Sequence, residues 1–196
     1  MNFKYLALIS AIAMTGCGSE DNEGFVKGAR SQSFLEGVWE IDCMINEDGD
    51  SSSSGRYEFR GNRIYLDARY FSDTSCSYQQ IGLDIEATFS LGREVILNSG
   101  EAAIRLVSQP ISAQLAYIES SHISALNERN ICGYSNWSSG NYKEIINCEY
   151  FSELVDGFEK DIIKVDEDSL YFGDSDFLDS SGYPTRLESI FATKVE

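Results

Sequence analysis

His122 is the first residue to consider for chemistry, because it is the only histidine in the 196-residue chain. A serine hydrolase needs a nucleophile, a base and an orienting acid, and His122 would have to be the base. Residues 133–137 begin like a nucleophile elbow around Ser135, but Trp137 stands where the closing glycine is required. Ser175, in a Gly-Asp-Ser run, has no histidine downstream to serve it. We therefore expect no catalytic residue and no enzymatic activity.

Acidic side chains gather in two places where they resemble the oxygen ligands of Ca²⁺, which takes about six to eight of them. The first place contains Asp166, Glu167, Asp168, Asp174, Asp176 and Asp179. The second, residues 46–50, begins like an EF-hand loop, but Tyr57 occupies the position of its bidentate glutamate. Because turns beside acidic strands explain both groups, we expect no metal ion and no other cofactor.

The chain carries 15 basic and 32 acidic side chains, which give a formal net charge of −17. A surface of this sign repels nucleic acid and anionic lipid headgroups, so we expect no nucleic-acid partner. We expect a monomer with a solvated acidic surface.

Residues 1–17 have the pattern of an export signal, with Lys4, an apolar run over residues 5–13 and then Met14-Thr15-Gly16-Cys17. A run of about nine apolar residues is too short to span a membrane, which takes roughly twenty. The segment resembles a bacterial lipoprotein signal peptide that ends in a lipobox. The resemblance implies cleavage after Gly16, acylation of Cys17, and a lipid-anchored domain in the periplasm or at the cell surface. Gly18, in place of an aspartate that would favour inner-membrane retention, favours the outer membrane of the cell envelope.

This resemblance divides the chain into three parts. Residues 1–16 are the expected signal peptide, and residues 17–33 are the lipidated cysteine with a flexible tether. The tether is rich in glycine, serine, asparagine and charge, so it cannot bury enough apolar surface to order itself. Residues 34–196 remain as one domain of ordinary size.

Four cysteines remain besides Cys17, and an even number in an exported chain predicts two disulfides with three alternative connectivities. We expect Cys43 to pair with Cys76 and Cys132 with Cys148, because each pair closes a local loop between neighbouring strand candidates. None of the four belongs to a C-x-x-C motif, so neither zinc binding nor redox chemistry is supported.

From Leu35 onward, apolar residues recur with the period of two that marks half-buried strands. The first run places Leu35, Gly37, Trp39, Ile41, Cys43 and Ile45 on one face. A Gly61-Asn62 turn predicts a hairpin, and turn residues at Gly92, 98–100 and Pro110 separate shorter runs. Residues 121–129 are the one helix expected, with a serine as N-cap.

Strand patterns resume at residues 142–150, 160–165, 170–172 and 187–195, the last with Phe191 on its inward face. About ten strand candidates with one short helix predict an all-β fold. We expect an antiparallel barrel, with a β-sandwich as the alternative, because closure removes the exposed edges of the sheet.

Gly37-Val38-Trp39 opens the first strand of the domain. This tripeptide resembles the G-x-W signature of the lipocalins, which stands at the same place. The resemblance implies a lipocalin-like barrel in which Gly37 and Trp39 form the base. It also makes Arg186 a counterpart of the arginine that covers the tryptophan in that family.

Six aromatic residues fall on the expected inward faces of strands: Trp39, Tyr57, Phe59, Tyr70, Phe89 and Phe191. If they line an open interior, the domain is a binding module for a small apolar ligand. If they fill the interior, it is a structural or protein-interaction domain. The sequence leaves both functions open.

Overall fold

Eight antiparallel strands close into a barrel in the computed structural model, which describes residues 32–155 and 160–195. Around the barrel the strands follow the order β4-β3-β2-β1-β9-β8-β7-β5, and pairing of β4 with β5 closes the ring. The strands are β1 (Gly37–Ile45), β2 (Ser52–Arg60), β3 (Arg63–Phe71), β4 (Gln79–Ile96), β5 (Ala102–Tyr117), β7 (Lys160–Asp166), β8 (Ser169–Gly173) and β9 (Leu187–Lys194). The expected all-β antiparallel barrel is confirmed, and the sandwich alternative is not formed.

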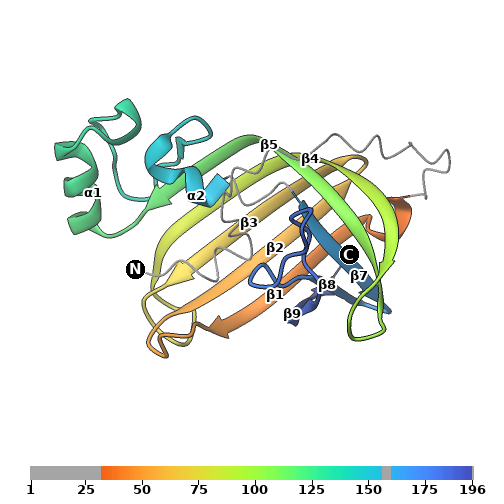
Figure 1. Ribbon diagram of the computed structural model, residues 1–196. Helices are drawn as coiled ribbons and strands as arrows, with labels where there is room; N and C mark the ends of the chain where they lie inside the picture. The colour runs from red at the N-terminus through yellow and green to blue at the C-terminus, as the bar shows by residue number, and fades with distance from the viewer. Residues whose placement is uncertain (1–31, 156–159, 196) are drawn as a thin grey trace.

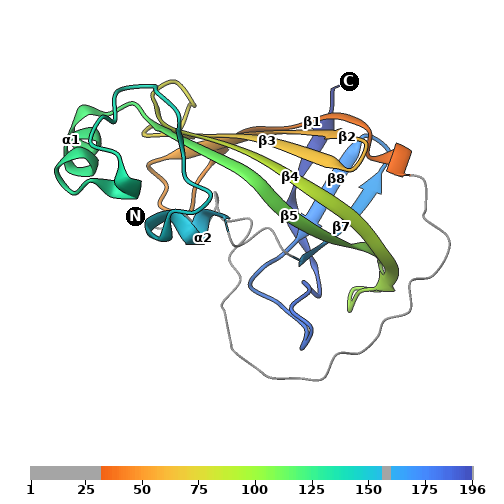
Figure 2. The same ribbon diagram turned by 90° about the horizontal axis from the view of Figure 1, so that it is seen from above.

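Strands β1 to β5 lie side by side as a long twisted sheet, and the short strands β7, β8 and β9 cross it at one end (Figures 1 and 2). A long insertion between β5 and β7 lies at the other end. It contains α1 (Ser120–Glu128), η2 (Ile131–Gly133), β6 (Lys143–Glu144), η3 (Glu149–Phe151) and α2 (Ser152–Val155). A 3₁₀ turn, η1 (Gln32–Phe34), precedes β1.

Strands β4 and β5 are longer than the sequence predicts, because the expected breaks at Gly92 and Pro110 are bulges inside continuous strands. Between the pairs Glu86–Ser112 and Ala87–Pro110, β5 holds one extra residue. β4 holds another beside Arg105, where a Cβ on Gly92 would come within 3.2 Å of the arginine Cβ. Bulges bend a strand and tolerate proline, so these residues curve the sheet instead of ending it.

A third bulge, between Ile41 and Met44, changes the facing of residues at the end of β1. The extra residue shifts the period of two, so Met44 packs against the core. Ile45 points outward and is 61% exposed, and Cys43 is exposed. The prediction that Cys43 and Ile45 share the inward face of Trp39 is therefore wrong.

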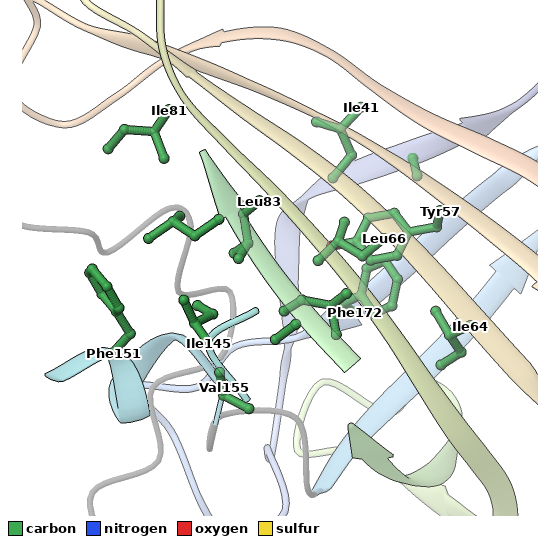
Figure 3. Packing of buried hydrophobic residues seen from close by; sticks show 14 of the residues in the cluster. Ile41, Tyr57, Ile64, Leu66, Ile81, Leu83, Ile145, Phe151, Val155 and Phe172 are labelled. Atoms are coloured by element: carbon green, nitrogen blue, oxygen red, sulfur yellow. The ribbon is translucent and has the colours of Figure 1, made fainter. Parts of the chain in front are cut away.

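The insertion covers the concave face of the long sheet with apolar side chains. Figure 3 shows Ile145, Phe151 and Val155 of the insertion facing Ile81 and Leu83 of β4. All five are buried, and each contributes about 1.5–3 kcal/mol on burial. The expected strand over residues 142–150 is largely wrong, because only the short β6 pairs with β5 there.

The helix expected over residues 121–129 is confirmed as α1, one residue earlier. Glu119 is its N-cap residue and makes no side-chain capping hydrogen bond, so the expected serine cap is wrong. Arg129 is the C-cap residue. Within the described ranges, no helix has both the length and the apolarity needed to cross a membrane.

Both expected disulfides are confirmed. Cys43–Cys76 joins β1 to the β3–β4 loop, with 5.8 Å between the two Cα atoms. Cys132–Cys148 joins η2 to the residue before η3, with 5.2 Å between the Cα atoms. The second bond therefore closes the insertion on itself.

Candidate functional site

The end of the barrel that carries η1 is organised around Trp39, whose side chain is fully buried. Its indole Nε1 donates a hydrogen bond to the carbonyl of Leu35 at 2.8 Å. Gly37 has a φ of 116°, a conformation that residues with a Cβ adopt only at a cost. The glycine and the tryptophan thus hold the chain as it passes from η1 into β1.

The cation beside the Trp39 ring is Lys194, whose Nζ lies 5.1 Å from the ring centroid. Trp39 and Lys194 are direct partners in the β1–β9 ladder. Arg186 lies before the start of β9, where its Nε donates to Asp174 at 2.6 Å and its guanidinium covers Phe177. The lipocalin-like resemblance pointed to Arg186, but the register of β9 brings Lys194 to this place.

Most of the expected inward aromatic residues fill the barrel. Trp39, Tyr57, Phe59 and Phe89 are buried, and Tyr70 packs partly buried against the same cluster. Phe191 is 43% exposed and packs on Tyr171, with 5.3 Å between ring centroids. The prediction for Phe191 is wrong because its neighbour, the fully buried Ala192, faces the core.

A concave region opens at the end of the barrel that carries η1, and we name it the mouth groove. Its volume is about 410 Å³, and six of its eight lining residues are apolar. The lining residues are Phe34, Glu94, Ala102, Ala103, Ile104, Ile163, Lys164 and Val165. They come from η1, from the end of β4, from the start of β5 and from the end of β7.

Lys164 places a positive charge at the rim of the mouth groove. Its Nζ lies 2.8 Å from Glu101 Oε1 and 3.6 Å from Asp166 Oδ2. The hydrogen bond to Glu101 raises the pKa of Lys164, so the ammonium stays charged. An apolar groove with Lys164 and Glu94 in its lining matches an amphiphile that has an apolar chain and a polar head.

Asp161 lies two residues before Ile163 of the mouth groove and was missed in the sequence. Its Oδ1 accepts hydrogen bonds from the backbone N–H groups of Ile162 at 2.7 Å and Gly173 at 2.9 Å. Burial raises the pKa of Asp161 to about 7, and the charge of Glu188 adds to the rise. A single acid before two buried isoleucines was the only sequence signal for this group.

His122 lies near an acid, but its Nδ1 forms no hydrogen bond with the described residues. Its Nδ1 lies 3.2 Å from Glu119 Oε2, and Ser121 donates to the other oxygen of Glu119 at 2.8 Å. In the part of the chain that the structure describes, no hydrogen bond joins His122 to a serine. Ser135 is exposed, beside the buried Trp137. The absence of enzymatic activity stays a prediction.

Members of both acidic groups are paired with protein groups, in their own turn or on β5. Asp48 accepts hydrogen bonds from the backbone of Asp50 and Ser51 and from the Ser51 hydroxyl. Asp174 pairs with Arg186, and Asp179 pairs with Arg105 at 2.8 Å. Over residues 32–155 and 160–195, no group of three histidine, cysteine or acidic side chains has the arrangement of a metal site.

Cys17 and the expected cleavage site lie outside the described residues. No protein-family model and no curated protein matches the chain.

Proposed function

We propose that this chain is a lipid-anchored lipoprotein of the bacterial cell envelope whose barrel binds a small amphiphilic molecule in the mouth groove. The observation that carries the proposal is the groove itself. Its volume of about 410 Å³ falls within the roughly 300–1,000 Å³ of small-molecule sites. Its lining is mostly apolar, with Lys164 at the rim, as expected for a ligand with one polar end.

The buried centre of the barrel limits how such a ligand binds. Trp39, Phe59, Leu83 and Leu115 leave at most 2% of their surface exposed. We infer that the ligand lies in the mouth groove, against the partly exposed Phe34, Ile104 and Val165, rather than deep in the barrel.

The membrane anchor is supported by residues 4–17, which combine one lysine, a short apolar run and a cysteine preceded by small residues. The two disulfides of the barrel agree with an oxidising compartment outside the cytosol. Anchoring through acyl chains on Cys17 would keep the domain at the membrane, since each buried methylene adds about 0.8 kcal/mol.

A second candidate function is protein interaction, and it is favoured by an aromatic pair on the outer face of β8 and β9, in which Phe191 is exposed and Tyr171 half-buried. Tyr171 and Phe191 contact each other there. In this alternative the barrel is a filled scaffold, and the outer face of β8 and β9 is the functional surface.

Ligand binding is tested with dansyl-labelled undecanoic acid and two matched tryptophan variants on β5. Ile104→Trp fills the mouth groove and should weaken binding by about tenfold or more, a loss of about 1.4 kcal/mol. Val107→Trp changes an outward, partly exposed position of the same strand and should bind like the parent. Equal affinity of all three proteins, or no binding by the parent, would refute the mouth groove as the site.

Anchoring is tested by labelling cells with an alkyne analogue of palmitate. The parent should carry the label and fractionate with membranes, whereas Cys17→Ser should lose both properties. Label retained on Cys17→Ser would place the lipid elsewhere, and a label-free parent would refute the lipoprotein proposal.

A further inference from the structure

A second hollow lies on the outer wall of the barrel, over β2, β3, β4 and β5, and we name it the outer groove. Its volume is about 250 Å³. Its lining residues are Arg56, Tyr65, Leu66, Asp67, Asp84, Ile85, Glu86, Ser112 and Gln114. Unlike the mouth groove, it is lined mainly by side chains that donate or accept hydrogen bonds.

The strand register places these polar groups in two adjacent rows. Asp67 is the direct partner of Arg56 on one side and of Asp84 on the other, and Asp84 is in turn the partner of Gln114. In the next row Tyr65 is the direct ladder partner of Glu86, and Glu86 is that of Ser112. These three residues complete the set of polar groups that line the groove. Directly opposed side chains on one face lie about 4.5–5.5 Å apart at Cβ, so each row presents closely spaced polar groups.

The three carboxylates of the outer groove, Asp67, Asp84 and Glu86, are paired with two guanidinium groups. Arg69 donates to Asp67 at 2.6 Å and to Asp84 at 2.8 Å. Arg63 pairs with Glu86. Arg56, which also lines the groove, lies 3.6 Å from Glu58 and 3.8 Å from Glu40, and neither acid lines the groove. Each charged group that lines the groove is therefore already paired with a group of opposite charge, and carboxylates and guanidinium groups remain as acceptors and donors.

Without a cation between them, the carboxylates of Asp67 and Asp84 would destabilise the sheet. Like charges directly opposite in a sheet repel each other, and Arg69 is the group that bridges them. Burial raises the pKa of Asp67, with Arg69 opposing the rise and Asp84 adding to it. Two partly buried carboxylates with unfilled lone pairs are thus held side by side at the floor of the groove.

Tyrosine rings flank the ionic groups along the strand direction. Tyr65 lines the groove itself. Tyr142, from the insertion, lies against Gly82 so closely that a Cβ there would overlap its hydroxyl. Arg69 lies 5.7 Å from the Tyr142 ring centroid and so connects this tyrosine to Asp67 and Asp84. Arg60 lies 5.7 Å from the Tyr65 ring centroid, so each of the two rings has an arginine over one of its faces and a ligand would contact the other face.

We propose that the outer groove binds a neutral carbohydrate, with one sugar ring lying over Asp67 and Asp84 against Tyr65. Sugar hydroxyls both donate and accept, which matches carboxylates and guanidinium groups that are already paired with one another. The C–H face of a sugar ring matches the face of a tyrosine. The volume is below the roughly 300 Å³ at which drug-sized sites begin, so the occupant is limited to about one ring.

Saturation-transfer difference NMR on the full chain tests this site with glucose, galactose and N-acetylglucosamine, alongside the charged analogues glucuronic acid and glucosamine. At least one neutral sugar should receive saturation and bind more tightly than both charged analogues. Tyr65→Ala and Asp84→Asn should each weaken binding by about tenfold. Tyr171→Ala, which removes an aromatic ring from the outer face of β8, is the matched control and should bind like the parent.

The site is overturned if none of the three neutral sugars receives saturation at millimolar concentrations, or if Tyr171→Ala loses as much binding as Tyr65→Ala. Circular dichroism establishes that each variant is folded. The amide variant Asp84→Asn keeps the shape of the side chain and therefore still reports on the groove if Tyr65→Ala unfolds. Ile104→Trp, the mouth-groove variant, should leave sugar binding unchanged, so failure of the amphiphile proposal is distinguishable from failure of this one.

Discussion

Replacing Asp161 by asparagine should remove a pH dependence from the stability of the barrel. The carboxyl group has an ordinary pKa of 3.8 in the unfolded chain and about 7 in the folded one. Below pH 3.8 the carboxyl group is protonated in both states, so its ionisation does not change the free energy of unfolding. Between the two pKa values only the unfolded chain ionises readily, so the free energy of unfolding falls as the pH rises, until both states are ionised above pH 7.

The size of this effect depends on the difference between the pKa values of Asp161 in the folded and the unfolded chain. Each unit of pKa difference corresponds to about 1.4 kcal/mol, so a rise from 3.8 to about 7 gives a ceiling of about 4 kcal/mol. The Asp161 side chain keeps partial contact with solvent, which places the observed loss below this ceiling. An asparagine oxygen accepts the same two backbone hydrogen bonds, from Ile162 and Gly173, so Asp161→Asn should fold.

Urea unfolding at several pH values between 4 and 8, followed by tryptophan fluorescence, measures the effect. The unfolding free energy of the parent should fall relative to that of Asp161→Asn as the pH rises. Asp166→Asn removes an equal charge from an exposed position on the same strand and should keep the slope of the parent. Parallel profiles for the parent and Asp161→Asn would refute the reasoning, because the carboxyl would then ionise equally in both states.

Three further predictions concern the elements that hold the barrel together. Replacing Cys132 and Cys148 together by serine should cost about 3 kcal/mol, from the 16-residue separation that the bond closes, and should lower the urea midpoint. Lys194→Met should cost about 0.5–1 kcal/mol and change the emission of Trp39, because it removes the cation from the indole. Gly37→Ala should cost about 1–3 kcal/mol in urea unfolding, because of its φ of 116°.

Each of these predictions has a control within the chain. Arg186→Met should leave the tryptophan emission unchanged. If Arg186→Met changed the emission and Lys194→Met did not, the placement of Lys194 beside Trp39 would be contradicted. Gly55→Ala, in a strand where an added Cβ meets atoms no closer than 3.8 Å, should cost less than Gly37→Ala. An unchanged urea midpoint in the double serine variant would mean that the Cys132–Cys148 bond does not restrict the unfolded chain.

The sequence by itself determined the class of fold and the local pairings. The Gly61-Asn62 turn and helix α1 depend on short stretches of chain and were predicted correctly, and alternating apolar residues located most of the strands, although not the segment 142–150. The Cys43–Cys76 and Cys132–Cys148 bonds were predictable too, because each closes a local loop. Gly37 and Trp39 were found from their place at the start of the first strand.

Only the tertiary structure decided which side chains face the core and which meet in a groove. A bulge inserts one residue and reverses the facing of the residues after it, as at Ile45, and bulges depend on pairing with another strand. Long-range pairing also put Lys194 rather than Arg186 beside Trp39. Burial of Asp161 and the meeting of Asp67 with Asp84 likewise arise from contacts between strands, which no local pattern contains.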